Sequence, residues 1–341
     1  YLAGLARARR YGALACWTLF FAGAALLAHQ NPAGYEPSEG TWHFRRGMAF
    51  AAAGDPRAAL AAYERALTHK PDEGAVHNNI ARTLLRLGRT EEALAALARG
   101  LEAAPGFAPL HNSLGFWHYE QGNLRLAAAY FRRALALRPR YALAHINLGH
   151  LLAAQGHPDR ALESFQRAAD IAPDRADAHY NAGRMHFALG QPREAARCYR
   201  DALRAQPRFV KAWNNLGYML LVLGDETGAE AALHQAVTLD PEYALAWLNL
   251  GHVHMARSRT REAAHAYRTA MAADPKDPAA PFNLGRLEEE AGNDMKAWEY
   301  YSESLARDPA FGPVRERLGL PPADSRKGPA GGAAEMGRGA N

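Results

Sequence analysis

The 341-residue sequence predicts an all-α fold, a right-handed superhelical solenoid of eight helix-turn-helix repeats. Three observations predict this fold. A proline returns every 34 residues from Pro71 to Pro309, small residues return at fixed positions between these prolines, and Gly or Ser occupies the turn in the middle of each unit. Since one helical hairpin cannot bury its apolar face alone, such units must stack against one another.

The unit at 210–243 shows why each half is expected to be a helix. Its first half carries apolar residues at helical spacing, among them Leu216 and Leu220, and Gly224 ends it where a positive φ is useful. Leu233 lies on the apolar face of the second half, and Pro241 ends the unit because proline cannot continue a helix. Positions in every repeat are numbered from 1 to 34, so Val210 is position 1 of this unit.

Three positions explain how the two halves of a repeat pack. Position 20 is always alanine, from Ala59 to Ala297. Position 8 is always small: Gly47, Ala81, Gly115, Gly149, Gly183, Gly217, Gly251 and Gly285. Position 24 is aromatic or leucine: Tyr63, Leu97, Phe131, Phe165, Tyr199, Leu233, Tyr267 and Tyr301. Small residues let the paired helices approach closely, and the large side chain fills the space between them.

The period and these positions resemble the tetratricopeptide repeat (TPR) family. The resemblance covers residues 40–311 without an insertion, and the predicted repeats are 40–73, 74–107, 108–141, 142–175, 176–209, 210–243, 244–277 and 278–311. In TPR proteins the first helices line a concave groove through positions 2, 5, 6, 9, 12 and 13. The resemblance therefore implies a scaffold that binds a protein or peptide partner.

Position 6 is the first candidate for partner binding. It carries an amide in six repeats: Asn79, Asn147, Asn181, Asn215, Asn249 and Asn283. An amide is both a donor and an acceptor, so a row of amides can grip the backbone of an extended peptide. The row resembles that of the TPR arm of O-linked N-acetylglucosamine transferase. The alternative is that asparagine is the family consensus here and bonds the neighbouring helix.

Positions 5, 9 and 12 supply the other candidate groove residues. The predicted set is apolar and aromatic, with cations between: Arg82, Phe116, His150, Tyr180, Arg184, Phe187, Tyr218, His252 and Arg286. A contiguous apolar groove marks a partner site. Some of these side chains are alternatively expected to pack against the next repeat. The basic set that grips a C-terminal carboxylate in chaperone-binding TPR proteins is missing, since position 5 holds no Lys and position 9 no Asn.

The N-terminal segment predicts a membrane anchor. After a basic flank at 1–10, residues 11–28 are uncharged and would span roughly 27 Å as a helix. A cleaved signal peptide and a buried helix are the alternatives. The flanking arginines favour extracytoplasmic repeats, periplasmic in a bacterium or secreted after cleavage, with 29–39 as a linker. The chain begins at Tyr1 rather than Met, as a fragment of a longer protein would.

The C-terminal end predicts a cap and a tail. Residues 312–320 are expected to form a short capping helix that partly covers Trp298 and Leu305 of the last repeat, because an uncapped solenoid end exposes apolar surface. Residues 321–341 are poor in large apolar side chains, so we expect a disordered tail.

The absence of further motifs, the net charge and the positions of the histidines exclude several classes of function. No phosphate loop or catalytic motif is present, which predicts a protein that is not an enzyme and needs no cofactor. The formal charge of +5 does not indicate nucleic acid binding. Position 4 holds five of the fifteen histidines but also Trp213 and Trp247, so it is interpreted as an apolar packing slot and not as a metal site.

These observations predict a non-enzymatic, membrane-tethered scaffold that binds an extended peptide segment. Two alternatives stay open at this point. The chain could be the substrate-recruiting arm of a glycosyltransferase, of the O-GlcNAc-transferase-like or multi-pass membrane type, whose catalytic part is absent from it. It could instead be a coat protein that functions through self-association.

Overall fold

The computed structural model describes residues 38–321, and within that range all regular secondary structure is α-helical. The predicted segments 1–10, 11–28 and 322–341, and most of the linker, lie outside the described residues. The chain divides after Pro139 into two compact units. The all-α TPR solenoid predicted from the sequence is confirmed in each unit.

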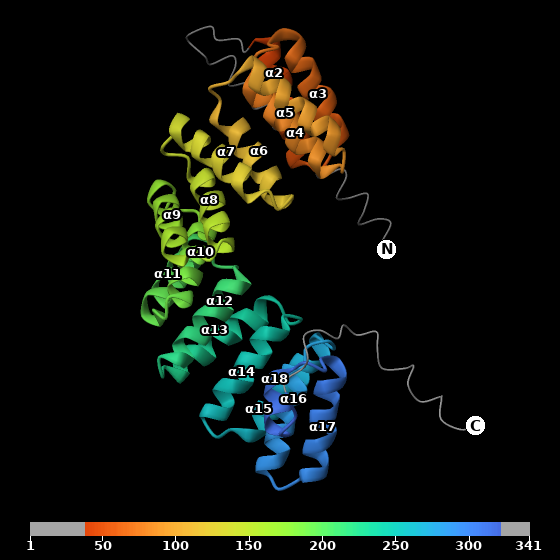
Figure 1. Ribbon diagram of the computed structural model, residues 1–341, viewed down its shortest axis with the longest axis vertical. Coiled ribbons are helices and arrows are strands. Elements are labelled where there is room, and N and C mark those ends of the chain that lie inside the picture. The colour runs from red at the N-terminus through yellow and green to blue at the C-terminus, as the bar shows by residue number, and fades with distance from the viewer. Residues whose placement is uncertain (1–37, 322–341) are drawn as a thin grey trace, which may run out of the picture. The chain divides into compact units, whose positions relative to one another are not determined.

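The first unit consists of three helical hairpins (Figure 1). They are α2 (Glu39–Ala52) with α3 (Pro56–His69), α4 (Gly74–Arg86) with α5 (Thr90–Ala103), and α6 (Ala108–Glu120) with α7 (Leu124–Leu137). Each hairpin packs against the next, so that one apolar core runs through α3, α4 and α5.

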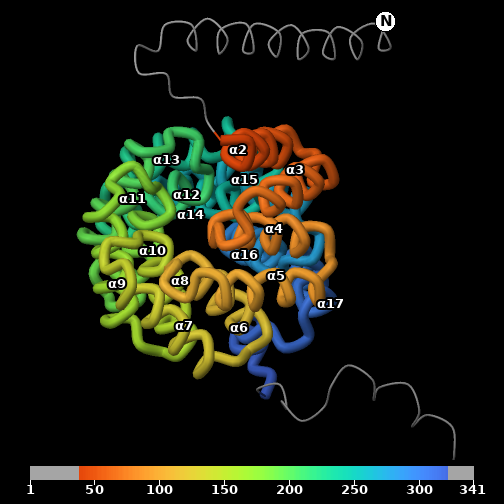
Figure 2. The backbone as a smooth tube through the Cα atoms, turned by 90° about the horizontal axis from the view of Figure 1, so that it is seen from above, coloured from red at the N-terminus to blue at the C-terminus, as the bar shows by residue number. Residues whose placement is uncertain are grey.

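The second unit consists of five hairpins and one short terminal helix. They are α8 (Ala142–Ala154) with α9 (Pro158–Ile171), α10 (Ala176–Ala188) with α11 (Pro192–Ala205), α12 (Val210–Val222) with α13 (Glu226–Leu239), α14 (Ala244–Ala256) with α15 (Thr260–Ala273), and α16 (Ala279–Glu290) with α17 (Asp294–Arg307), followed by α18 (Gly312–Arg317). In Figure 2, α10 and α12 lie on the inner side of this unit, and α11 and α13 lie on its outer side.

Position 8 must be small because position 24 occupies the space beside it. A Cβ atom added to Gly183 would lie 2.7 Å from Cε1 of Tyr199, whereas ordinary contact begins at 3.4 Å. The Tyr199 side chain is 1% exposed and has little room to move. The second repeat has Ala81 at position 8 and Leu97, which is smaller than an aromatic residue, at position 24. The larger residue at position 8 is thus paired with a smaller one at position 24.

The turn inside each hairpin needs a left-handed backbone. Gly190 has a φ of +70°, and the glycines at the same position of six other repeats are similar. The seventh repeat places Ser258 there at a φ of 57°, the one non-glycine residue with positive φ among the described residues. A Cβ in this region is strained, so Ser258 lowers the stability of its own turn.

Position 4 is a hydrogen-bonding slot, so interpreting it as only an apolar packing slot was incomplete. Nε2 of His77 lies 2.8 Å from the carbonyl oxygen of Pro71, and Nε1 of Trp213 donates to that of Pro207 at 2.9 Å. Trp247 makes the same bond at 2.9 Å. His and Trp both carry a ring N–H, and in these repeats it ties the first helix to the loop that precedes it.

The C-terminal helix α18 is the beginning of a ninth repeat. Val314 stands at position 3 and is fully buried, and Nη1 of Arg315, at position 4, donates to the Pro309 carbonyl at 2.9 Å. Phe311, Val314 and Leu318 pack beside Leu305. The expectation that this segment also covers Trp298 is wrong, since that side chain is 59% exposed.

The predicted localisation as a single-pass membrane protein requires correction. Among residues 38–321, every helix is too short or too polar to cross a bilayer. The longest helices there have 14 residues, against the roughly 20 that a span requires. Segment 11–28, on which the prediction depended, lies outside the described residues.

Candidate functional site: the groove face of the second unit

The amides at position 6 link successive repeats. In the second unit, Nδ2 of Asn215 donates to the hydroxyl of Tyr180 at 3.3 Å, and Nδ2 of Asn249 donates to Oδ1 of Asn214 at 2.9 Å. In each case a position 6 side chain bonds to position 5 of the preceding repeat. Ser113 repeats the pattern in the first unit, donating to Oδ1 of Asn78 at 2.7 Å.

Burial of the amides supports the same structural role. Asn181, Asn249 and Asn283 are between 6% and 8% exposed. Asn181 and Asn283 also donate to the carbonyl oxygens of Asp177 and Ala279 in their own helices, at 2.8 and 2.9 Å. Each of the three amides therefore makes at least one hydrogen bond inside the chain. Asn79 and Asn147 are half-buried, and Asn147 also has interactions within the chain.

The groove face is the surface that the first helices of the second unit form, and two aromatic rings are exposed on it. Phe187 on α10 is 48% exposed, and Tyr218 on α12 is 36% exposed. Their ring centroids lie 5.9 Å apart at an interplanar angle of 82°, an edge-to-face pair. Since side chains from consecutive first helices meet here in solvent, this pair offers a hydrophobic contact to a partner.

Tyr180 has a different role from the exposed pair. Its ring packs 4.8 Å from Phe209 and 5.7 Å from Tyr199, centroid to centroid, and its hydroxyl accepts the Asn215 amide. Tyr180 is thus a half-buried interface residue that supports α12. Asn214 was not predicted as a site residue, although the doubled asparagine at 214–215 is visible in the sequence.

The central groove face carries positive charge. Arg184, one turn before Phe187, and Lys211, two turns before Tyr218, are both exposed. Neither forms an ion pair within residues 38–321. Asp177, the acid on the same face of α10, is held by Arg175, whose Nε donates to its carboxylate at 3.0 Å. The unpaired charges on this surface, those of Arg184 and Lys211, are therefore positive.

The two groove histidines are neutral bases at physiological pH. Burial lowers the pKa of His150, and the nearby Arg184 lowers it further. Burial also lowers the pKa of His252, more than the hydrogen bond with Asn283 raises it. Each histidine packs edge-to-face against the aromatic ring at position 24 of its own repeat, His150 against Phe165 and His252 against Tyr267. These histidines therefore serve packing more than charge.

The remaining predicted residues do not join this centre. Phe116 is 45% exposed and Arg82 is exposed, but both belong to the first unit. Arg286 on α16 lies 3.8 Å from Glu290, an ion pair on the surface of its own helix. The predicted residues brought together by contact in the second unit are Asn181 with His150, Tyr180 with Asn215, His252 with Asn283, and Phe187 with Tyr218.

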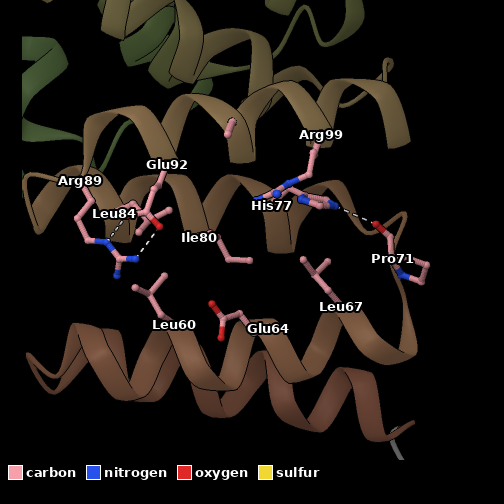
Figure 3. Close-up of a pocket in the computed structure, with 11 residues that line it drawn as sticks. Leu60, Glu64, Leu67, Pro71, His77, Ile80, Leu84, Arg89, Glu92 and Arg99 are labelled. Carbon is pink, nitrogen blue, oxygen red and sulfur yellow. Dashed lines mark hydrogen bonds and ion pairs between the residues drawn. The ribbon is translucent and has the colours of Figure 1, made fainter.

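A separate cleft of about 340 Å³ lies in the first unit between α3 and α5, over α4 (Figure 3). Leu60, Ile80 and Leu84 form its apolar base and are 5% to 7% exposed. Two acids and two arginines line its edge, so its charge favours no class of ligand. The cleft shows how position 21, here Leu60, is covered by positions 7 and 11 of the following repeat.

Comparison with known families agrees with this geometry. The model described as the cilia and flagella-associated protein 70 C-terminal domain matches residues 144–335, more than half of the chain. Two tetratricopeptide repeat models match residues 50–114 and 107–174. The chain therefore belongs to the family of the first model, and its repeats are tetratricopeptide repeats. None of the curated proteins compared with the chain matches it.

Solved structures show the same fold at low sequence identity. A chain of the APC/C hetero-tetramer Cut9–Hcn1 is 19% identical with a TM-score of 0.59, over 77% of this chain and 52% of that one. This chain thus spans about half the length of that relative. PilW, a type IV pilus biogenesis factor, is 22% identical with a TM-score of 0.55, over 62% of this chain and 98% of PilW.

A third structure, PilF of Pseudomonas aeruginosa, is 18% identical with a TM-score of 0.54, over 62% of this chain and 96% of PilF. At these identities the likeness concerns the fold alone. A TPR fold is typical of scaffolds that bind protein or peptide partners. The predicted resemblance to the arm of O-linked N-acetylglucosamine transferase is not shown by these matches.

Proposed function

We propose that the chain is a scaffold whose second unit binds an extended peptide segment on the face formed by α10 and α12. The observation that carries this proposal is the exposed edge-to-face pair Phe187–Tyr218, with Arg184 and Lys211 beside it. An extended peptide alternates its side chains, so one side can place an apolar residue on the rings and acids near the two cations.

The amides have a supporting role in this proposal. Asn215 holds α12 to α10, which supports the spacing at which Tyr218 meets Phe187, and Asn249 holds α14 to α12. The row of amides thus pre-organises the surface, while the rings and cations contact the partner. Pre-organised aromatic contacts are the usual anchors of protein interfaces.

The test uses two synthetic peptides of equal length, both apolar at alternate residues, with Asp at the other residues in one and Lys in the second. Fluorescence anisotropy with the full chain measures the dissociation constants. We expect the acidic peptide to bind more tightly than the basic one. Phe187→Ala combined with Tyr218→Ala should weaken it at least about tenfold, since truncating an anchor costs roughly 2 kcal/mol or more.

Two further variants complete the design. Arg184→Glu with Lys211→Glu should reverse the preference between the peptides, whereas Leu126→Ala, an exposed apolar residue of the first unit, should leave both constants unchanged. Circular dichroism melting checks that each variant is folded. Equal binding of both peptides, or acidic-peptide binding that survives loss of both rings, would refute the proposal.

A further inference from the structure

The last complete repeat exposes an apolar surface on α17. Met295 is 81% exposed and Trp298 is 59% exposed, the two highest values among the large apolar side chains of the described residues. They are three residues apart and so share one face of the helix. This surface, Met295 with Trp298, is called the α17 face below.

Other repeats do not carry such a face. Position 18, occupied by Met295, is polar and exposed in the seven other repeats: Arg57, Glu91, Arg125, Asp159, Arg193, Thr227 and Arg261. Position 21, occupied by Trp298, is buried or half-buried in every one of those repeats, as for Leu60 at 7% and Ala196 at 1%. The eighth repeat therefore has a methionine where the chain elsewhere has a charge or a hydroxyl, beside an uncovered tryptophan.

The short length of α18 explains why Trp298 stays uncovered. In the first unit, Ile80 and Leu84, at positions 7 and 11, line the cleft over Leu60 at position 21 (Figure 3). The helix α18 ends at Arg317, which is position 6 of the incomplete ninth repeat, and Gly319 follows with a φ of +65°. Among residues 38–321, no helix continues past Arg317 to cover position 21.

We propose that a second copy of this chain covers the α17 face, with the two α17 helices antiparallel across a two-fold axis. Charge complementarity favours this occupant. Lys296 and Glu299 flank the α17 face, are exposed, and have no ion pair in the part of the chain that the structure describes. A two-fold axis brings a patch against itself, so Lys296 of each copy lies opposite Glu299 of the other.

Sedimentation velocity of the full chain over a range of concentrations tests this proposal. We expect a monomer–dimer equilibrium that shifts at least tenfold toward monomer in Met295→Arg combined with Trp298→Ala. Arginine is the residue that four other repeats carry at position 18, and both side chains are exposed, so the variant should stay folded. The matched control is Leu126→Arg, an exposed apolar residue at 49% on α7, which should leave the dimer unchanged.

Two more measurements identify the surface. Oxidation of Met295 by dilute peroxide, followed by mass spectrometry, should slow as the chain concentration rises. Lys296→Glu and Glu299→Lys should each weaken the dimer, and the double variant should restore it. A wild-type chain that stays monomeric, or association that persists in the double apolar variant, would overturn the proposal. The proposal would also be overturned if Met295 oxidation is slow at every concentration and becomes fast when residues 322–341 are deleted. That result would identify segment 322–341 as the occupant of the α17 face.

Discussion

Replacing Gly183 by alanine should destabilise the fifth repeat. The added Cβ would lie 2.7 Å from Cε1 and 2.9 Å from Cδ1 of Tyr199, so the ring must move by about 0.7 Å to reach the 3.4 Å of ordinary contact. Tyr199 is 1% exposed and also packs on Tyr180, which leaves the ring no free side. Overpacking of this kind costs about 1–3 kcal/mol, and the better helix propensity of alanine returns about 0.5–1 kcal/mol.

The expected net loss is thus about 0–2.5 kcal/mol, and it should depend on the residue at position 24. The second repeat pairs Ala81 with Leu97, so a leucine at position 24 can adopt a rotamer that accepts alanine, whereas Leu233 of the sixth repeat packs onto Gly217 and would lie 2.5 Å from an added Cβ. In a Tyr199→Leu background, Gly183→Ala should therefore be neutral or stabilising. The two substitutions should couple by about 1–3 kcal/mol in a double-mutant cycle.

Urea denaturation followed by circular dichroism, fitted with a nearest-neighbour repeat model, measures these free energies. Gly106→Ala is the matched control, since an added Cβ there meets no atom within 4 Å and the backbone is not left-handed. Equal effects of Gly183→Ala in the two backgrounds would refute the packing argument, because the cost would then come from the backbone and not from the Tyr199 ring.

Four other outcomes are expected. Ser258→Gly should raise the melting temperature, by a gain of about 0.5–1 kcal/mol, because it removes a Cβ at a φ of 57°. Glu230→Gln should lower the free energy of unfolding by about 1–3 kcal/mol, since Glu230 accepts from both Arg257 and Arg259 across the α13–α14 interface; a loss equal to that of an exposed control such as Glu163→Gln would contradict this. Burial raises the pKa of the Cys198 thiol to about 11, so the thiol is protonated at pH 8, and iodoacetamide should label it slowly in the folded chain and rapidly in urea, as read by peptide mass mapping. Deleting 312–341 should lower the melting temperature or solubility, because it removes the buried Val314, whereas deleting 322–341 should not; equal melts for the two truncations would remove the capping role of α18.

The fold was predictable from the sequence because its constraints are local and repeated. A small residue at position 8 that faces a large one at position 24 is a requirement of one hairpin, and all eight repeats show this pairing. The prolines of position 32 were predicted to end each unit, and they also supply the carbonyl groups that His77 and Trp213 bond. That second role was not predicted, because position 4, which holds His or Trp, was interpreted from the apolar surface of these side chains and not from the ring N–H group that both carry.

The candidate site was less predictable, because sequence position does not say which hydrogen bonds a polar group has already made. Asn249 and Phe187 both occupy positions that the TPR resemblance assigns to the groove, yet one is 6% exposed and the other 48%. The difference comes from the partner across the repeat interface: Asn214 accepts the Asn249 amide, whereas Phe187 meets another exposed ring. Only contacts between repeats separate groove-facing residues that support the fold from those available to a partner.

The groove and the α17 face should act independently. A repeat in a solenoid contacts only its neighbours, and α13 to α16 separate Tyr218 on α12 from Trp298 on α17 along the chain. Substitutions without shared partners add in free energy to within about 0.5 kcal/mol. The Phe187→Ala and Tyr218→Ala pair should therefore weaken the acidic peptide equally in the dimeric chain and in the Met295→Arg and Trp298→Ala variant. If two copies joined at α17 bound one long peptide together, the monomeric variant would instead lose affinity with both rings intact. Anisotropy titrations of the four combinations distinguish a dimer with two separate grooves from a dimer that binds one shared partner.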